Sequence, residues 1–455
     1  MNMLDRLERS SKIALIQGKK KISFADLLEQ GLRFGSDMGE QGINKADYIL
    51  IFIPLSISLY QTFIGTWAIG AVPIFIDFSR GVDFVNDAIV RLQPKAMICD
   101  HVTGLVRLKY PALRKVKVLK VSEKGDEITH LDLDNEHPAV LTFTSGTTGT
   151  PKVVIRSHGF LMDQYDVLSK HADFSSDHKD LGTLAIFTVA NLLSNITTVL
   201  PKKRYKTKVI PKELAKSIEK EGINRLIGSP KLIADLLQYS HLPMVKVIYL
   251  GGAPVYPSVA EKVPKHIALH IVYGSTEAEP IAHIRWSEVG EAMLKKIKLG
   301  HGLPVGRVIP EVECMIGEES EILVRGAIVL AKDGVGAWHP TGDTGFFDED
   351  GLLWLTGRVS QTIKDRHGIL HPFAVECVLD DHFGIRGAVL NVSDSRVVVI
   401  EENGPTEKQI LSALAAFKIE RVVIVENLPM DKRHGAKINY NHVREMMTNE
   451  PFYSQ

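Results

Sequence analysis

The stretch "LTFTSGTTGTPKVV", residues 141–154, decides how this chain is interpreted, because it places a polar loop with two glycines between two apolar runs. The flanking runs, 139–143 and 153–155, are rich in the branched and aromatic residues typical of β-strands. Between them the loop offers backbone N–H groups, hydroxyls and the ammonium of Lys152. This composition predicts a cradle for a phosphate or another small anion.

Two other interpretations of this loop compete with the anion cradle. A Walker A loop has a longer spacer between its first glycine and a Gly-Lys pair, whereas here two residues separate Gly146 from Gly149 and Pro151 precedes Lys152. The Walker A motif is therefore excluded. A purely structural turn remains an alternative, because such turns are common without any ligand.

Length and composition limit the class of protein. A chain of 455 residues is too long for one compact core, so we expect at least two domains. A formal net charge of +0 gives no electrostatic reason to expect nucleic acid as a partner. Cys99, Cys314 and Cys377 form no C-x-x-C pair and no disulfide pattern, and the opening "MNMLDRLERSSK" is unlike a secretory signal. We expect a cytoplasmic protein.

The uncharged stretch 48–76 is long enough to raise the question of a membrane span. Helix breakers such as Pro54, Gly70 and Pro73 interrupt it. We therefore interpret it as a strand at 49–53, a helix at 56–69 and a second strand at 72–76, which is a parallel α/β unit. No membrane span is expected.

This alternation of short apolar runs and helical stretches continues along the chain and predicts an α/β fold. We expect a large N-terminal domain, residues 1–358, with mostly parallel sheets flanked by helices. Beyond Arg358 the units become shorter, with two apolar runs at 388–402 and 421–429 around a helix near 407–417. That pattern predicts a small α+β C-terminal domain, residues 359–455.

The segment "VYGSTEAEP", residues 272–280, follows a strand-like run and brings an aromatic ring, hydroxyls and a carboxylate together. Tyr273 is suited to stack on a base, Thr276 to bind a phosphate oxygen, and Glu277 to hold Mg²⁺ between phosphates. The structural alternative is a turn at a strand end with a solvated acidic face.

The segment "HPTGDTGFFDEDGLLWLTGR", residues 339–358, adds Asp343, a carboxylate suited to paired ribose hydroxyls. It also adds Arg358, whose guanidinium is suited to a phosphate or to ribose. A hairpin that turns at 348–351 is the structural alternative. Both interpretations can hold, because binding sites are often mounted on turns.

In this order, the segments resemble the motifs of the adenylate-forming acyl-activating enzymes, which include acyl-CoA synthetases, luciferases and carrier-loading adenylation domains. The resemblance covers nearly the whole chain, and the motifs are jointly very specific. It implies ATP and Mg²⁺ as cofactors, and a small carboxylic acid as the substrate. It also implies an acyl acceptor, either coenzyme A or the phosphopantetheine of an acyl carrier protein.

The resemblance implies a role for each matching residue. The cofactor-binding set is Thr144, Ser145, Gly146, Thr147, Thr148, Gly149 and Lys152 at the phosphates; Gly251, Gly252, Ala253, Pro254 and Tyr273 beside adenine, with Gly274 and Ser275 in the same segment; and Asp343 at the ribose. Arg358 joins this set on its own chemistry, which suits a phosphate or ribose. Thr276 at the α-phosphate and Glu277 at the magnesium are also expected to take part in catalysis.

The family has a lysine near its C-terminus, and "LPMDKRHGAKINY", residues 428–440, offers Lys437. A lysine is needed because attack of a carboxylate on the α-phosphorus of ATP brings two anions together. In the common pattern the lysine lies closer to the proline and directly after glycine, so Lys432 is a competitor and an ordinary solvated lysine remains an alternative. We expect Lys437 to act from a mobile C-terminal domain.

Departures from the common pattern affect the expected reaction. Ser360 stands where an aspartate or lysine hinge residue is usual, and "LWLTGRVSQ", "GGAPV" and "RHGAKI" look like the subgroup with olefin β-lactone synthetases. Those enzymes let the substrate's own hydroxyl close a ring without coenzyme A, although this chain is short for that subgroup. An inactive nucleotide-binding relative is a third possibility, which the retained motif residues argue against.

The stretch 181–200 has no charged residue, whereas amino-acid-activating relatives usually carry an aspartate after the phosphate loop. An apolar wall favours an acyl chain or another simple carboxylic acid as the substrate. The alternative is that this stretch is an ordinary core helix.

Overall fold

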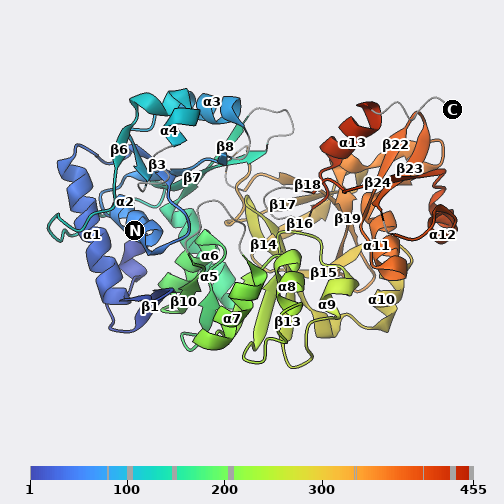
Figure 1. The fold of residues 1–455 in the computed structure, drawn as a ribbon, viewed down its shortest axis with the longest axis horizontal. Helices are drawn as coiled ribbons and strands as arrows, with labels where there is room; N and C mark the ends of the chain where they lie inside the picture. Colours follow the sequence, from blue (N-terminus) through green and yellow to red (C-terminus); the bar gives the residue numbers. More distant parts are fainter. Residues whose placement is uncertain are drawn as a thin grey trace. The chain divides into compact units, whose positions relative to one another are not determined.

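The computed structural model describes residues 2–78, 81–99, 106–145, 151–202, 210–332, 334, 336–402, 404–430 and 437–449. The chain divides into two compact units, Met1–Ile227 and Gly228–Gln455, and each combines sheet and helices (Figure 1). The boundary predicted at 358/359 falls inside the second unit, and the mobility of the part that follows it stays a prediction.

The first unit contains a six-stranded sheet among its described residues. Its strands, in spatial order, are β6 (Lys117–Leu119), β5 (Ala96–Cys99), β3 (Tyr48–Phe52), β4 (Val72–Phe75), β7 (Pro138–Ser145) and β8 (Pro151–Ser157). Each neighbouring pair from β6 to β7 is parallel, whereas β8 runs antiparallel to β7. The α/β prediction is confirmed here, because parallel strands need helical crossovers between them.

The uncharged stretch 48–76 forms the predicted strand–helix–strand unit, β3, α2 (Ile57–Ala68) and β4. Helix α2 packs so closely on α1 (Phe24–Glu40) that a side chain at Gly35 would meet the carbonyl oxygen of Gly65 at 3.0 Å. The stretch is apolar because this helix is buried on nearly all sides. Within the described ranges, no helix combines the length and the apolar character that a membrane crossing requires.

The other strands of the first unit lie in the spatial order β2 (Lys20–Ser23), β1 (Ile13–Gln17), β10 (Thr197–Leu200), β9 (Lys179–Leu181) and β11 (Arg225–Gly228). From β1 to β11 the neighbours are parallel. The remaining helices of this unit are α3 (Val82–Leu92), α4 (Val106–Lys109), α5 (His158–His171), α6 (Ala185–Leu193) and α7 (Pro211–Glu221).

The second unit has its own succession of strands, in the spatial order β12 (Val247–Leu250), β13 (Ala268–Ser275), β14 (Ala278–Arg285), β15 (Leu303–Val308), β19 (Leu353–Arg358), β18 (His339–Phe347), β17 (Glu321–Arg325) and β16 (Glu313–Ile316). Only the β12–β13 pair among these neighbours is parallel. The rest is antiparallel because short turns, such as 276–277 and 348–352, join consecutive strands directly. Its helices before residue 358 are α8 (Pro230–Leu237), α9 (Pro257–Ala260) and α10 (Glu291–Lys298).

The C-terminal part of this unit is the predicted α+β arrangement, drawn in orange and red in Figure 1. Its elements are β20 (Ile363–Asp365), β21 (Gly368–Leu370), α11 (Pro372–Phe383), β22 (Gly387–Val392), β23 (Ser395–Glu401), α12 (Glu407–Ala413), β24 (Arg421–Val425) and α13 (Tyr440–Asn449). Helix α11 shares one apolar cluster with the β22–β23–β24 sheet, and α13 shares another. This arrangement buries both faces of the small sheet.

A buried histidine anchors the N-terminal segment of the first unit. His158, the first residue of α5, has no exposed surface, and its Nδ1 accepts a hydrogen bond of 3.2 Å from the Met3 N–H. Its ring stacks on His137, with 6.0 Å between centroids. Burial, with a smaller contribution from His137, lowers the pKa of His158 from 6.5 to about 3.

The lowered pKa predicts how stability depends on pH. Below pH 6.5 the side chain of residue 158 binds a proton in the unfolded chain, whereas in the folded protein it stays neutral down to about pH 3. The free energy of unfolding therefore decreases as the pH is lowered from 6.5 to about 3. His158 alone should lower the free energy of unfolding by about 1.4 kcal/mol for each pH unit in this range. In H158N, which keeps an acceptor near the Met3 N–H, urea unfolding between about pH 6 and pH 4 should be less steeply pH-dependent. Equal slopes in the two proteins would contradict the assignment.

Candidate active site

Three of the predicted residues meet at one carboxylate in the second unit. Asp343 on β18 accepts a hydrogen bond of 2.9 Å from the Tyr273 hydroxyl at Oδ2 and one of 2.7 Å from Arg358 Nη1 at Oδ1. The two donors come from β13 and β19, and Arg358 is the register partner of Asp343 in the β18–β19 pair. The sheet therefore brings together residues that lie up to 85 positions apart in the sequence.

The electrostatics of this cluster keep Tyr273 neutral and Arg358 charged. Burial, together with the charge of Asp343, raises the pKa of Tyr273 well above its ordinary value, so the tyrosine stays a neutral donor. Burial works against the charged form of Arg358, but its pKa is raised because the attraction and hydrogen bond of Asp343 outweigh that effect. Each carboxylate oxygen can accept a further hydrogen bond, and Asp343 is only half-buried.

The turn between β13 and β14 carries the other predicted residues of this segment. A side chain at Gly274 would meet the carbonyl oxygen of Ala278 at 2.9 Å, so the tight turn requires glycine. Thr276 is exposed and Glu277 is half-buried. The negative charge of Glu277 contributes to raising the pKa of Arg358. The Ser275 hydroxyl is buried and finds no hydrogen-bond partner among the described residues. A polar group in that condition fits a site that a ligand completes.

The predicted adenine-side turn, 251–254, follows β12 directly. A side chain at Gly251 would meet the carbonyl oxygen of Val272 at 3.0 Å, and Gly252 has a φ of +75° in the left-handed region. These two glycines allow the turn to lie against β13, one residue from Tyr273. The structure thus places 251–254 beside Tyr273, although the contact of either with adenine stays a prediction.

The predicted phosphate loop is only partly described. Thr144 and Ser145 end β7, and Lys152 lies in β8 as the register partner of Thr144. The strands predicted on either side of the loop are therefore confirmed as an antiparallel pair. Gly146, Thr147, Thr148 and Gly149 lie outside the described residues, so their predicted role is untested.

Of the two candidate lysines, only Lys437 lies among the described residues. Lys437 is exposed and precedes Ile438, whose backbone bridges Met430. Lys432 lies outside the described residues. The assignment of catalysis to Lys437 stays a prediction.

The uncharged stretch 181–200 contains helix α6. Leu184, which caps this helix, and its first residues, 185–187, are apolar and half-buried, whereas 188–193 are buried. They follow the carboxyl end of β9, beside the parallel strands β10 and β11, and ligands of α/β proteins commonly bind at such an edge. The first half of α6 therefore offers an apolar surface at a favourable position.

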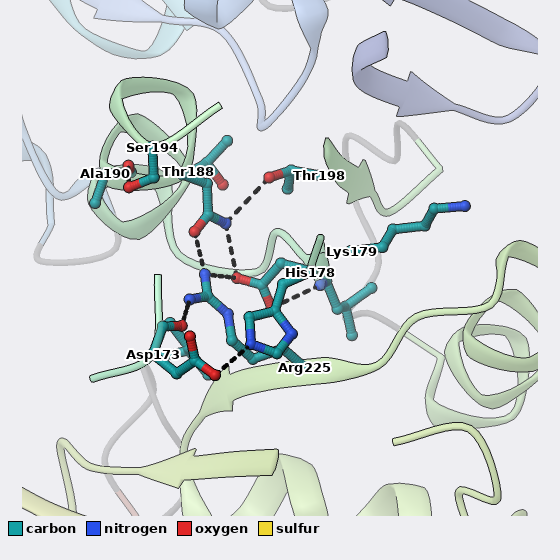
Figure 2. Close-up of polar contacts among 12 residues, drawn as sticks. Asp173, His178, Lys179, Thr188, Ala190, Ser194, Thr198 and Arg225 are labelled. Atoms are coloured by element: carbon teal, nitrogen blue, oxygen red, sulfur yellow. Dashed lines mark hydrogen bonds and ion pairs between the residues drawn. The ribbon is translucent and has the colours of Figure 1, made fainter. Parts of the chain in front are cut away.

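A buried polar cluster, which the sequence did not indicate, holds α6 in place (Figure 2). Asn191 Nδ2 donates to Asp180 Oδ2 at 2.7 Å and to Thr198 Oγ1 at 3.0 Å. Arg225 Nη2 donates to Asp180 Oδ2 at 3.1 Å and also to Asn191 Oδ1. The helix is thereby tied to β9, β10 and β11. Asp180, the carboxylate closest in sequence to the uncharged stretch, is already occupied by these donors.

No cluster of three or more His, Cys, Asp and Glu side chains suited to a metal ion occurs in the described ranges. A magnesium ion that is held mainly by nucleotide phosphates needs only one or two protein carboxylates. Glu277, beside the buried Ser275 hydroxyl, fits that limited requirement.

This geometry predicts different effects for two conservative variants. Tyr273→Phe removes a buried hydrogen bond to a charged acceptor and should lower the free energy of unfolding by about 1.5–3 kcal/mol. Glu277→Gln, on a half-buried turn, should change it by less than about 0.5 kcal/mol. Urea titration of both variants checks the contrast. If Glu277→Gln destabilises the protein as much as Tyr273→Phe, Glu277 is a structural residue.

Comparison with curated proteins finds relatives along most of the chain. An olefin beta-lactone synthetase of Stenotrophomonas maltophilia is 25% identical over 87% of this chain and 86% of its own. The acetyl-coenzyme A synthetase of Bacillus subtilis is 26% identical over 90% of this chain and 79% of its own. A 2-succinylbenzoate–CoA ligase of Listeria innocua is 23% identical over 98% of both chains.

Solved structures have the same fold. ATP-bound MatB from Rhodopseudomonas palustris matches with a TM-score of 0.82 at 20% identity, over 100% of both chains. The O-succinylbenzoate coenzyme A synthetase of Bacillus subtilis, in complex with ATP and magnesium, matches with a TM-score of 0.82 at 19% identity, over 97% of this chain and 98% of its own. The family model described as "AMP-binding enzyme" matches residues 6–336, most of the chain. The chain is therefore a member of the AMP-binding enzyme family.

Proposed function

We propose that this protein activates a carboxylic acid with ATP and then transfers the acyl group to a thiol. In the first step a carboxylate oxygen attacks the α-phosphorus, the bond from that phosphorus to the β-phosphate oxygen breaks, and pyrophosphate leaves. In the second step a thiol sulfur attacks the acyl carbon, AMP leaves with the carboxylate oxygen, and the thiol proton passes to solvent. The observation that carries this proposal is the Tyr273–Asp343–Arg358 cluster in a chain of this family.

The residues of the second unit suit a nucleotide. Asp343 is held by two donors and retains acceptor capacity for a pair of ribose hydroxyls. Thr276 is exposed for an α-phosphate oxygen, and the turn 251–254 lies beside Tyr273 for the base. Glu277 would hold Mg²⁺, which when bound neutralises phosphate charge. The phosphate loop, 144–152, would receive the leaving pyrophosphate.

The first half of α6 suits the hydrocarbon part of an acid. Its residues 185–187, with Leu184 just before the helix, are apolar and half-buried. The Asp180 carboxylate, close by in the sequence, is engaged by Arg225 and Asn191. Among the described residues, the stretch 181–200 has no carboxylate, and Asp180 just before it is engaged, so neither is suited to pair with a substrate ammonium. This favours an acyl or fatty acid over an amino acid.

Coenzyme A is the acceptor that we favour, because ligases that use it are among the relatives of this chain. A phosphopantetheine on an acyl carrier protein offers the same thiol. The second candidate reaction is β-lactone formation from a β-hydroxy acid, in which the hydroxyl replaces the thiol. The relatives named olefin beta-lactone synthetase favour this alternative. For each reaction we propose a cytoplasmic location.

The acyl acceptor is tested by incubating the protein with ATP, Mg²⁺ and a panel of acids, with and without coenzyme A. We expect acid-dependent exchange of labelled pyrophosphate into ATP, and an acyl thioester by mass spectrometry only when coenzyme A is present. A β-hydroxy acid converted to its dehydrated cyclic product without coenzyme A would establish the alternative. Release of ADP instead of AMP would contradict both reactions.

Lys437 should serve the adenylation step. Removing a cation that stabilises the developing charge typically slows such a step by about 100-fold to 1,000-fold, so Lys437→Ala should slow adenylate formation by that factor. Because the side chain is exposed, stability should barely change. Thioester formation from preformed acyl-adenylate should be largely retained. Lys432→Ala is the matched control, and a loss in that variant without a loss in Lys437→Ala would reverse the assignment.

A further inference from the structure

A buried carboxylate in the second unit joins three segments of the chain. Glu376 on α11 is 2% exposed, and its Oε2 accepts hydrogen bonds from the Tyr256 hydroxyl at 2.5 Å and from Arg386 Nη2 at 3.2 Å. Its Oε1 accepts a hydrogen bond of 2.9 Å from the Tyr440 hydroxyl. Tyr256, Glu376 and Arg386 precede the β22–β23–β24 sheet in the sequence, and Tyr440 follows it.

The three donors compensate the cost of burying this charge. A buried carboxylate is strongly unfavourable unless it is paired and hydrogen-bonded. Here Arg386 supplies the opposite charge and also lies over the Tyr256 ring, 4.4 Å from its centroid. Tyr256 and Tyr440 are 1% and 5% exposed, so water does not compete for these bonds.

The two tyrosines connect Glu376 to different parts of the candidate site. Tyr256 follows Pro254 of the adenine-side turn by two residues and precedes α9. Tyr440 is the first residue of α13 and follows Lys437 by three residues. The Asn439 N–H donates to the Pro429 carbonyl at 2.8 Å. This bond ties residues 437–440, here called the lysine segment, to the earlier part of the chain. The two tyrosine partners of Glu376 therefore lie two residues from the adenine-side turn and three residues from Lys437.

A second contact between α9 and α11 supports the same docking. Asp380 lies one helical turn after Glu376, and its carboxylate accepts hydrogen bonds from the Ser258 N–H, at 3.2 Å, and from the Ser258 hydroxyl. Helix α11 thus holds the segment 256–258 with two carboxylates on one face. Further along α13, which begins at the end of the lysine segment, Arg444 Nη2 donates to the Ser360 carbonyl at 3.1 Å.

We propose that Glu376 is a positioning residue, which aligns the Lys437 segment with the adenine-side turn through Tyr440 and Tyr256. It does not touch the reacting atoms. The proposal rests on the proposed function, because it assigns Lys437 to adenylation. If so, the hydrogen bond from Tyr256 to Glu376 affects the rate of adenylation only because it positions Lys437. Losing this bond should slow adenylation in a protein that has Lys437, and should have little effect once Lys437 is removed.

The test is a double-mutant cycle. The rate of single-turnover adenylate formation is measured for the parent, for Tyr256→Phe, for Lys437→Ala and for the double variant. Tyr256→Phe should slow this step by about tenfold or more when Lys437 is present, and leave the rate within about twofold when Lys437 is absent. The KM for ATP should change little in Tyr256→Phe. Tyr110→Phe is the matched control, because Tyr110 is a buried tyrosine that donates to the Phe78 carbonyl at 3.1 Å in the first unit. It should lose stability without a specific loss in adenylation.

Hydrogen exchange gives a readout that requires no activity. In Tyr256→Phe the Asn439 amide, which bonds to the Pro429 carbonyl, should exchange at least about tenfold faster than in the parent, and in Tyr110→Phe it should not. Equal slowing of adenylation by Tyr256→Phe in both lysine backgrounds, or unchanged exchange at Asn439, would overturn the positioning role. A parent protein without acid-dependent adenylation would refute the proposed function, while the exchange result would still decide whether Tyr256 holds the lysine segment.

Discussion

The carboxylate of Asp343 is the point on which the second unit's site depends. It receives one donor from β13 and one from β19, so it fixes the distance between strands that the sequence separates widely. It lies beside the buried Tyr273 and forms an ion pair of 2.7 Å with Arg358. The turn with Glu277 follows β13 directly, and the adenine-side turn, which follows β12, lies against the same strand at Val272.

The carboxylates of this protein divide by how fully their acceptor capacity is used. Asp180, Asp365 and Glu376 are buried among arginine partners and further donors. Asp343 is half-buried with two donors, and Glu277 is half-buried on a turn. Saturated carboxylates hold segments together, whereas an unsaturated one can bind a ligand. This contrast separates the structural carboxylates from those that we assign to ATP and magnesium.

Much of the fold follows from the sequence, because strong local patterns coincide with the final elements. The apolar alternation at 48–76 predicts β3, α2 and β4 with ends that differ by a residue or so, and the turn at 348–351 predicts the β18–β19 hairpin. The motif residues Tyr273 and Arg358 both donate hydrogen bonds to Asp343, although the contact of these three residues with a nucleotide stays a prediction. The sequence did not reveal the clusters around Arg225 and Glu376, because periodicity does not mark a buried polar residue and its partners lie far away in the chain. Apart from the β18–β19 hairpin, the antiparallel pairs of the second unit were likewise unforeseen, since pairing depends on turn length more than on strand composition.

In the proposed reaction a carboxylate oxygen of the substrate attacks the α-phosphorus of ATP. An accepted acid whose carboxylate carries a heavy-oxygen isotope allows this oxygen to be followed through one complete turnover. One labelled oxygen should appear in AMP, whether the acyl group then passes to a thiol or to the substrate's own hydroxyl. Label found in inorganic phosphate, or AMP without label, would contradict this reaction.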